Sequence, residues 1–257
     1  MNHNLIIGKN SFVGKSLKNK FKGTYISSKE IFDVNFSNYK NIILLSSPEI
    51  YKRKKIKKFL FEKKILKKIS FQKLIFFSTS KIYPNKIECS ENMSCEPQNH
   101  YAENKLNLEK LLRKEHKKTL IFRFSNIFDV DIVNKNTFLG QMHKNFFQKN
   151  KIIFDINLNS LRDFISMHNV KKVLDNVENK SLYGTFNIGS QTGYKISEII
   201  KFYFGFNALK TTPIYETKIL KSQTLSIKKI RKVLSIKKNE FHIETKKQLL
   251  KCKKFFF

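Results

Sequence analysis

Short, nearly continuous apolar segments alternate with helix-like segments through the first half of the chain. Strands are predicted at residues 4–7, 24–26, 41–47, 74–83 and 119–128. Apolar runs without polar alternation are typical of strands buried on both faces, and their alternation with helices is typical of a parallel sheet. Too few residues separate the second and third strands to hold a helix. The pattern therefore predicts an α/β fold with a doubly wound parallel sheet.

The helical period predicts the rest of the secondary structure. In the first half, helices are expected at residues 15–21, at 52–68, and from 101 onward through 105–112. The second half is expected to hold strands at 151–154 and 184–189, and helices at 138–147, 168–177, 196–204, 225–234 and 246–250. We therefore expect a Rossmann-type domain over residues 1–150. A smaller C-terminal α/β lobe over 151–257 is expected to bind substrate and to be partly interleaved with the first domain.

The charge and the lysine content bear on which ligands the protein is expected to bind. The 257-residue chain has a formal charge of +31, but 46 of its 51 basic residues are lysines, spread along nearly the whole chain. Specific nucleic-acid binding, which favours clustered arginine, is therefore not expected, whereas attraction to anionic substrates is. The bias is typical of a lysine-rich proteome.

Targeting and metal signals are not found in the sequence. No segment reaches the ~18 uncharged apolar residues that a membrane span needs, and the N-terminus does not resemble a signal peptide. We expect a cytoplasmic protein without a membrane partner. Cys89, Cys95 and Cys252 fit neither a disulfide framework nor a zinc pattern, so free thiols and no metal are expected.

A glycine turn follows the first predicted strand. Gly14-Lys15-Ser16 is similar to the end of a P-loop, but the two glycines, Gly8 and Gly14, are separated by five residues where that motif needs four. The alternative is a dinucleotide-binding turn, Gly-x-x-Gly-x-x-Gly, with Ser11 at the middle position. We favour the second interpretation, in which the turn binds a diphosphate. Its contacts would come from Gly8, Ser11, Phe12, Val13 and Gly14.

The end of the second predicted strand bears on cofactor choice. Dinucleotide-binding folds commonly place an acid there, which binds the adenosine ribose. Here the residues are Ser27, Ser28 and Lys29. Without a carboxylate at these positions, a 2′-phosphate could be bound by Ser28 and Lys29, which slightly favours NADP over NAD. A lysine at position 29 is also explained by composition alone.

A tyrosine and a lysine four residues apart follow the predicted strand 74–83. Tyr101 and Lys105 would share one helix face, and an ammonium close to a phenol favours the phenolate. The strand would deliver Ser78, Thr79 and Ser80 to the same edge of the sheet. A tyrosine, a lysine and a hydroxyl residue placed together in this way could transfer a proton to or from a carbinol or carbonyl oxygen. In a lysine-rich chain the alternative is a solvated helix start.

Together these motifs resemble the extended short-chain dehydrogenases/reductases, in the NAD-dependent epimerase/dehydratase group that acts on nucleotide sugars. The resemblance runs in order along nearly the whole chain. It rests on Gly8–Gly14, Asp33-Val34, Ser78–Tyr83, Pro97 with Tyr101–Lys105, Arg123–Asn126, Arg162–Ile165, Phe186–Gly189 and Leu225–Leu234.

The resemblance implies roles for individual residues. Tyr101 would be the acid/base, Lys105 would bind the nicotinamide ribose and lower the tyrosine pKa, and Thr79 would be the catalytic hydroxyl. Ser80, Asn126 and Arg162 would bind the substrate, although Arg162 could instead pair with a neighbouring carboxylate. The cofactor, NAD or NADP, would be bound by Gly8, Ser11, Phe12, Val13, Gly14, Ser28, Lys29, Asp33, Val34, Ser46, Tyr101 and Lys105.

The departures from the family pattern limit the reaction. Ser80 and Lys81 stand where 4,6-dehydratases carry a pair of acids, so dehydratase activity is not expected, and Pro84 replaces a glycine. The expected function is an NAD(P)-dependent epimerase or keto-reductase that acts on a nucleotide-activated sugar. The alternative is a catalytically silent Rossmann protein that senses NAD(P). The family also implies a homodimer formed through the Tyr101 helix.

Overall fold

The computed structural model describes residues 2–45, 47–130, 137–149, 151–154, 156–205 and 213–252. The chain forms two compact units, each assembled from separate segments. The large-sheet unit comprises Met1–Pro84, Glu91–Phe124 and Lys171–Asn187, and the small-sheet unit comprises Asn85–Ser90, Ser125–Val170 and Ile188–Phe257. The functional division at residue 150 stays a prediction.

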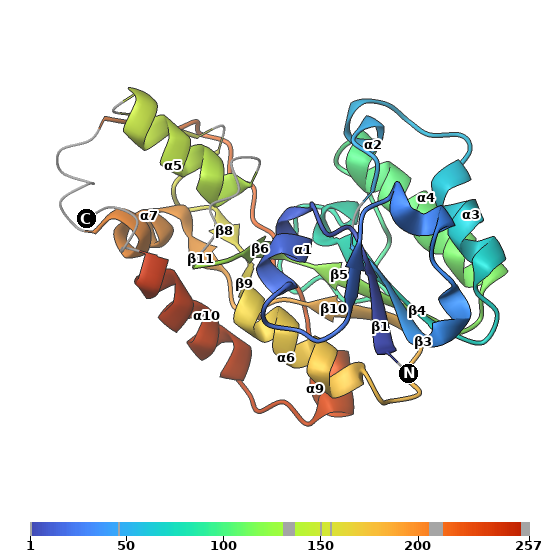
Figure 1. Cartoon of the computed structure of the whole chain (residues 1–257). Helices are drawn as coiled ribbons and strands as arrows, with labels where there is room; N and C mark the ends of the chain where they lie inside the picture. Colours follow the sequence, from blue (N-terminus) through green and yellow to red (C-terminus); the bar gives the residue numbers. More distant parts are fainter. Residues whose placement is uncertain are drawn as a thin grey trace. The chain divides into compact units, whose positions relative to one another are not determined.

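A six-stranded sheet forms the centre of the large-sheet unit, with helices beside it (Figure 1). Its order is β10-β5-β4-β3-β1-β2. The strands are β1 (Asn2–Ile7), β2 (Thr24–Ile26), β3 (Tyr39–Leu44), β4 (Lys73–Thr79), β5 (Thr119–Phe124) and β10 (Gly184–Ile188). From β2 to β5 every neighbouring pair is parallel, with Ile6 opposite Ile43 and Ile43 opposite Ile75. The predicted α/β fold class is confirmed.

The helices of this unit are α1 (Phe12–Leu17), α2 (Ile50–Arg53), α3 (Leu60–Lys68) and α4 (His100–Glu115). Between β2 and β3 the chain forms two 3-10 helices, η1 (Glu30–Phe32) and η2 (Phe36–Asn38), and no α-helix, as expected. The predicted strand 74–83 ends earlier than expected, because the 3-10 helix η3 (Ser80–Ile82) follows Thr79 directly.

The single helix predicted at 52–68 is wrong, since the segment is divided into α2 and α3. Between them, the side chain of Asn104 binds the main chain: its amide donates to the carbonyls of Tyr51 (2.9 Å) and Lys54 (2.8 Å) and accepts from Ile56 N (2.8 Å). Six of the seven residues from 52 to 58 are basic, all except Ile56, and their charges would repel one another in a continuous helix.

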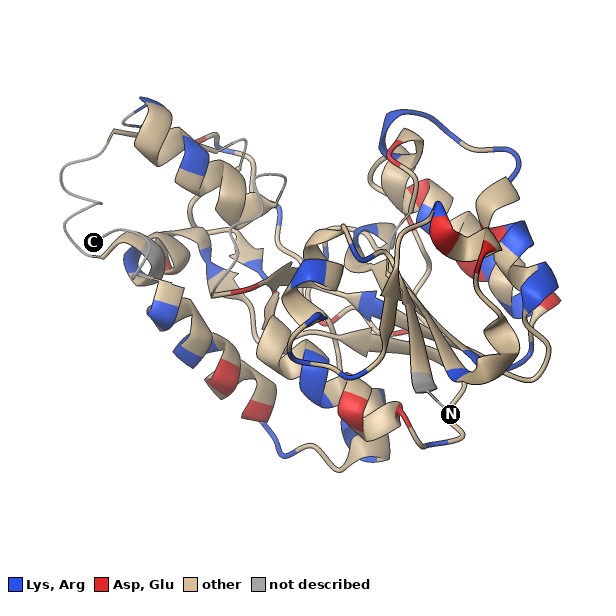
Figure 2. Ribbon diagram, in the orientation of Figure 1, with Lys and Arg blue, Asp and Glu red and all other residues tan. Residues whose placement is uncertain are grey.

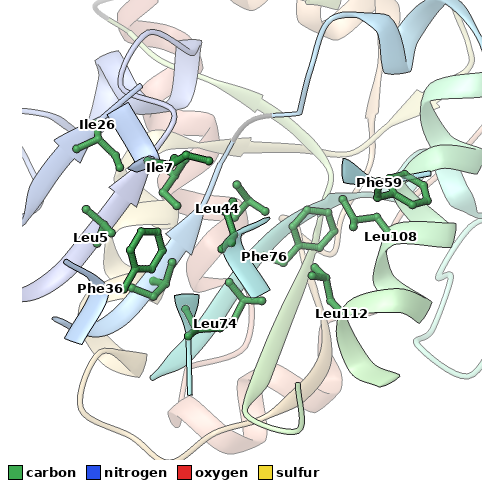
Figure 3. Packing of buried hydrophobic residues seen from close by; sticks show 14 of the residues in the cluster. Leu5, Ile7, Ile26, Phe36, Leu44, Phe59, Leu74, Phe76, Leu108 and Leu112 are labelled. Atoms are coloured by element: carbon green, nitrogen blue, oxygen red, sulfur yellow. The ribbon is translucent and has the colours of Figure 1, made fainter. Parts of the chain in front are cut away.

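The core between the sheet and helix α4 is apolar and tightly buried. Figure 3 shows Phe76 of β4 next to Leu108 and Leu112 of α4, and the same cluster extends through Leu74 of β4 and Leu44 of β3 to Leu5 of β1. Each such side chain contributes roughly 1.5–3 kcal/mol on burial. This packing fixes α4 against the strands and therefore determines where Tyr101 and Lys105 lie.

The small-sheet unit is built from short strand pairs and helices. Its strands pair as β6 (Asn126–Phe128) with β9 (Phe164–Ser166), β8 (Leu161–Arg162) with β11 (Tyr194–Lys195), and β7 (Ile152–Ile153) with β12 (Ile214–Tyr215). Its helices are α5 (Phe138–Lys149), α7 (Ile196–Phe204), α9 (Lys228–Leu234) and α10 (Glu240–Lys251), while α6 (Met167–Val177) continues into the large-sheet unit. An aromatic core includes Phe138 stacked on Phe154 at 5.6 Å.

The distribution of charge, the hydropathy of the helices and the state of the cysteines can be compared with the sequence-based expectations. Figure 2 shows lysine and arginine on helices and loops of both units, in keeping with a bias of the whole chain. Within the described part of the chain, no helix is long and apolar enough to cross a membrane. Cys89, Cys95 and Cys252 are free thiols, as expected.

Candidate active site

The glycine turn lies between β1 and α1, at the carboxyl end of the sheet. Gly8 has a φ of 121°, a conformation that favours glycine, and its amide donates to Ile26 O at 2.8 Å. A Cβ on Gly14 would lie 2.1 Å from the Gly8 carbonyl oxygen. Both glycines are therefore required by the turn itself, and the carboxyl edge beside them is where parallel sheets bind nucleotides.

Ser11 starts helix α1. Its hydroxyl accepts from Gly14 N at 3.0 Å and donates to Gly8 O at 2.7 Å, as a helix N-cap does. Helix α1 therefore begins at Phe12, three residues before the predicted start at 15, and it ends at Leu17. Ser11, which the sequence placed at the middle position of the turn, closes that turn with its side chain.

Glu30 is a carboxylate that the sequence analysis did not consider. It lies in η1 after β2, where its Oε1 accepts from Lys9 Nζ at 2.6 Å and its Oε2 accepts from Ser27 N at 2.7 Å. These bonds, first of all that from Lys9, lower the pKa of Glu30 to about 2. An acid therefore does stand at the end of β2, tied to the glycine turn. The sequence signal for it was an acid four residues after the last residue of the predicted strand.

The other predicted cofactor residues lie along the same edge or outside the described residues. Ser28 and Lys29 are exposed between β2 and η1. Asp33 directly follows η1 and is exposed, whereas Val34 packs against the apolar core. Ser46 lies outside the described residues.

Ser78 and Thr79 end β4 and Ser80 begins η3, and all three hydroxyl residues are buried. Thr79 Oγ1 accepts from Lys81 N at 3.2 Å and so caps η3, while Ser78 Oγ donates to Glu109 at 2.5 Å. The main chain of η3 is bonded to the segment before α4, because Gln98 N donates to Lys81 O at 3.1 Å. The end of β4 and the start of α4 are therefore held together.

Helix α4 places Tyr101 in its first turn and Lys105 one turn later. Asn99 caps the helix by accepting from Ala102 N at 3.0 Å. The side chain of Lys105 is 1% exposed, and its ammonium donates to Phe77 O at 2.7 Å. The same ammonium lies 4.4 Å from the ring centroid of Phe76 and 5.7 Å from that of Tyr101. Lys105 thus reaches the strand that ends in Thr79, and the Tyr101 ring lies next to its ammonium.

Burial determines the protonation of both residues. It raises the pKa of Tyr101 to about 12 and lowers the pKa of Lys105 to about 8, against the charges of Glu62 and Glu109, which raise it. The pKa of Tyr101 is thus raised, not lowered as predicted, and burial is the cause. The ammonium of Lys105 donates to the Phe77 carbonyl. A phenol with this pKa keeps its proton at neutral pH and can act as a proton donor.

Behind the site, a buried polar network joins α4 to β5 and β10. Arg123 Nη2 donates to Glu109 Oε2 at 2.7 Å, and its Nη1 donates to the Tyr83 hydroxyl, also at 2.7 Å. Tyr83 in turn donates to Asn187 Oδ1 at 2.8 Å. The sequence analysis missed Glu109, although an arginine inside an apolar strand indicates a buried acid.

In the small-sheet unit, Asn126 is hydrogen-bonded to Asp163, the residue that directly follows Arg162. Asn126 Nδ2 donates to Asp163 O at 2.8 Å, and Arg162 pairs with Tyr194 across β8 and β11. The Asp163 carboxylate accepts from Ser190 N at 2.8 Å and from Leu225 N at 3.0 Å. Asp163 therefore connects three motifs: the strand of Arg162, the segment after Asn187 and the start of the closing segment.

Comparisons with known proteins agree with this arrangement. Residues 68–157, which hold β4, α4 and β5, match the family model described as the RmlD substrate binding domain. No curated protein matches the chain in sequence. Many solved structures match it in fold.

Three of these structures illustrate the likeness. dTDP-glucose 4,6-dehydratase from Bacillus anthracis, in complex with NAD, has a TM-score of 0.79 and 14% identity over 100% of this chain and 96% of that chain. RMD from Pseudomonas aeruginosa, complexed with NADPH, has a TM-score of 0.75 and 16% identity over 98% and 99%. UDP-N-acetylglucosamine 4-epimerase from Methanobrevibacter ruminantium has a TM-score of 0.75 and 16% identity over 99% and 98%.

At these identities the solved structures show the shared fold. Taken with the match to the family model, they confirm the resemblance to NAD-dependent epimerase/dehydratase enzymes of the short-chain dehydrogenase/reductase type.

Proposed function

We propose that this protein is an NAD(P)-dependent epimerase or keto-reductase that acts on a nucleotide-activated sugar. The observation that carries the proposal is the placement of Tyr101 and Lys105 beside the hydroxyl-bearing end of β4, on the carboxyl edge that also holds the glycine turn. The similar structures carry NAD, NADPH or a UDP-sugar derivative, which supports this choice of cofactor and substrate class.

The glycine turn fits a dinucleotide. A Cβ at Gly14 would meet the turn's own backbone, so the turn is as close-packed as approach to a diphosphate requires. Gly8, Ser11, Phe12, Val13 and Gly14 would contact the diphosphate. The adenosine would lie toward Ser28, Lys29, Asp33, Val34 and Ser46, and the nicotinamide ribose toward Tyr101 and Lys105. When bound, the nicotinamide supplies or accepts a hydride.

Tyr101 performs the proton transfer in this proposal. Its phenol, whose pKa burial raises from its usual value near 10 to about 12, holds its proton at neutral pH and can donate it to an oxygen that becomes a hydroxyl. Thr79 hydrogen-bonds the same oxygen, with Ser80 beside it. Reduction of a keto-sugar needs this direction of transfer, whereas epimerisation also needs the reverse. Asn126 and Arg162 bind the sugar and the diphosphate of the nucleotide.

Dehydration of the 4,6 type is not part of the proposal. Ser80 and Lys81, rather than acids, follow Thr79, so no carboxyl pair stands there to eliminate water. The dehydratase among the similar structures shares the fold at 14% identity, and its reaction is not transferred.

Two measurements test the proposal. Titration with NADH and NADPH, followed by nicotinamide fluorescence, should show saturable binding. Incubation with a panel of nucleotide sugars should then give products that differ by two mass units for redox, or equal-mass isomers for epimerisation. Tyr101→Phe should abolish turnover and retain cofactor binding, while the exposed Tyr183→Phe should behave as wild type. Binding without turnover on any sugar would instead identify a silent NAD(P) sensor.

Cofactor choice and assembly are tested separately. Lys29→Ala should weaken NADPH binding more than NADH binding if the NADP preference holds, and Glu30→Gln should improve NADPH binding by removing a negative charge. A preference for NADH in the wild type, abolished by Glu30→Gln, would show that the cofactor is NAD.

We also propose that the protein forms a homodimer through α4. Sedimentation at the mass of one chain would contradict it.

A further inference from the structure

The chain segment that carries the Thr79 hydroxyl is bound at both of its ends by one buried ion pair. At the first end, Ser78 Oγ donates to Glu109 Oε1 at 2.5 Å. At the last end, the Tyr83 hydroxyl accepts from Arg123 Nη1 at 2.7 Å. Arg123 Nη2 donates to Glu109 Oε2 at 2.7 Å, and both side chains are buried. The ion pair therefore holds the residues that lie directly before and after η3.

Further contacts fix the ion pair relative to this segment. Arg123 lies opposite Ser78 in the pairing of β4 with β5, and its guanidinium lies 5.1 Å from the centroid of the Tyr83 ring. The Tyr83 hydroxyl also donates to Asn187 Oδ1 at 2.8 Å, and both of these side chains are fully buried. Displacing any member of such a network leaves a buried partner without its hydrogen bond, which is costly. Both ends of the segment are therefore held in place.

Between these ends, the Thr79 hydroxyl is oriented by the main chain of η3. Its Oγ1 accepts from Lys81 N at 3.2 Å, and in the described part of the chain this side chain donates to no acceptor. Tyr83 N donates to Ser80 O at 3.0 Å and so closes the 3-10 turn. The orientation of the hydroxyl thus depends on the turn, and the turn depends on where Tyr83 lies. The proton of Thr79 can then be donated to a ligand oxygen.

We propose that Glu109, Arg123 and Tyr83 are positioning residues, which hold the Thr79 hydroxyl in the orientation that the reaction needs. They act through the two ends of the segment and not on the substrate. The inference deepens the proposed function and rests on it only for the role of Thr79 in the reaction. Releasing either end should misplace the hydroxyl. Misplacement of an aligned group slows the chemical step more than it weakens binding.

The first test measures hydrogen exchange at the Lys81 amide by NMR and needs no substrate. This amide reports on Thr79 directly, because its acceptor is Thr79 Oγ1. Thr79→Val gives the exchange rate in the absence of the acceptor. Ser78→Ala and Tyr83→Phe each release one end of the segment and leave the ion pair intact. Each should raise the Lys81 exchange rate roughly fivefold, on the scale of one lost hydrogen bond.

The matched control is another tyrosine of the large-sheet unit. Tyr25 lies on β2, and its hydroxyl donates to Phe21 O at 2.9 Å. Tyr25→Phe therefore removes one hydroxyl hydrogen bond, as Tyr83→Phe does, but away from η3. It should leave the Lys81 exchange rate unchanged.

The second test separates kcat from KM on a nucleotide sugar that the wild type turns over. Ser78→Ala and Tyr83→Phe should each lower kcat about tenfold, while KM and the cofactor Kd change by less than about twofold. A role in the fold alone would lower the melting temperature of these variants and leave the kcat of the folded enzyme unchanged. That result would overturn the inference.

The remaining outcomes also decide the question. An unchanged Lys81 exchange rate in either folded variant overturns the inference, and so does an equal rise in Tyr25→Phe. If one of Ser78→Ala and Tyr83→Phe does not fold, the other decides. If the exchange rate rises but the wild type turns over no nucleotide sugar, the proposed function fails and the positioning of Thr79 stands.

Discussion

Two buried carboxylates, one in each unit, are stabilised in different ways. Glu109 of the large-sheet unit is fully buried and is bound by the Arg123 guanidinium and the Ser78 hydroxyl. Asp163 of the small-sheet unit is 2% exposed and is bound by the amides of Ser190 and Leu225. The first carboxylate has a cationic partner in direct contact, and the second is held by neutral donors.

The kind of hydrogen-bond donor affects how readily a buried carboxylate takes up a proton. Burial raises the pKa of Asp163 to about 6, because its neutral donors offset only part of the cost of removing the charge from water. Glu109 and Arg123 are both ionic and are therefore mutually dependent. The comparison predicts that the Glu109 region fails when its cation is removed, whereas the Asp163 region responds to pH.

Arg123→Met should produce the largest effect. It leaves Glu109 as a buried carboxylate without its cation, which typically costs about 3–5 kcal/mol in the free energy of unfolding. Urea denaturation followed by circular dichroism measures this loss. Arg113→Met is the matched control, since Arg113 is exposed on α4 and donates to Thr185 Oγ1 at 3.4 Å, and it should cost less than about 0.5 kcal/mol. Equal losses in the two variants would mean that Arg123 acts through its apolar stem.

Asp163 should make stability depend on pH. Because its pKa is raised above the unfolded value, the folded state holds the proton more tightly, and its contribution is full below about pH 4 and is lost as pH rises through about 6. A shift of about two pH units corresponds to about 3 kcal/mol. The change in unfolding free energy between pH 4 and pH 6 should flatten by that order in Asp163→Asn. The exposed Asp175→Asn, measured in parallel, should leave the slope unchanged.

These particulars also show what could be predicted from the sequence. The parallel strands were predicted because apolar periodicity is a local property, and β2 lies at the expected residues 24–26. The motif pair Tyr101 and Lys105 was placed correctly on one helix, because its spacing alone determines the shared face. How the helix is oriented against β4 could not be predicted, since core packing determines it.

The errors have three physical origins: a polar contact between distant segments, a side-chain bond within a turn, and burial in the folded chain. The helix predicted at 52–68 is divided because Asn104, some fifty residues later, binds its main chain. The start of α1 moved because the Ser11 hydroxyl closes on Gly8. The pKa of Tyr101 was predicted to fall but rises, because the side chain is buried when the chain folds. None of these partners can be inferred from local propensity.

Gly189→Ala should test how firmly the neutral donors hold Asp163. An added Cβ would lie 2.5 Å from Asp163 Oδ2, the oxygen that also accepts from Leu225 N. If the carboxylate cannot move, the substitution should cost about 1–3 kcal/mol, as overpacking does. Thermal unfolding of Gly189→Ala, Asp163→Ala and the double variant forms a cycle, and the double variant should lose less than the sum. Additive losses would show that the added methyl group is accommodated elsewhere.

Ser190→Ala should have the smallest effect on the free energy of unfolding. It also shows which acceptor receives the proton of the Ser190 hydroxyl. The Ser190 hydroxyl lies 2.9 Å from Asp163 Oδ1 and 2.6 Å from Thr192 O, and it can donate to only one of them. Its loss should cost about 1 kcal/mol. If the hydroxyl donates to the carboxylate, removing it raises the pKa of Asp163 further, and the cost should be greater at pH 7 than at pH 4. A cost that is equal at both pH values would assign the proton to Thr192 O and leave Asp163 with backbone donors alone.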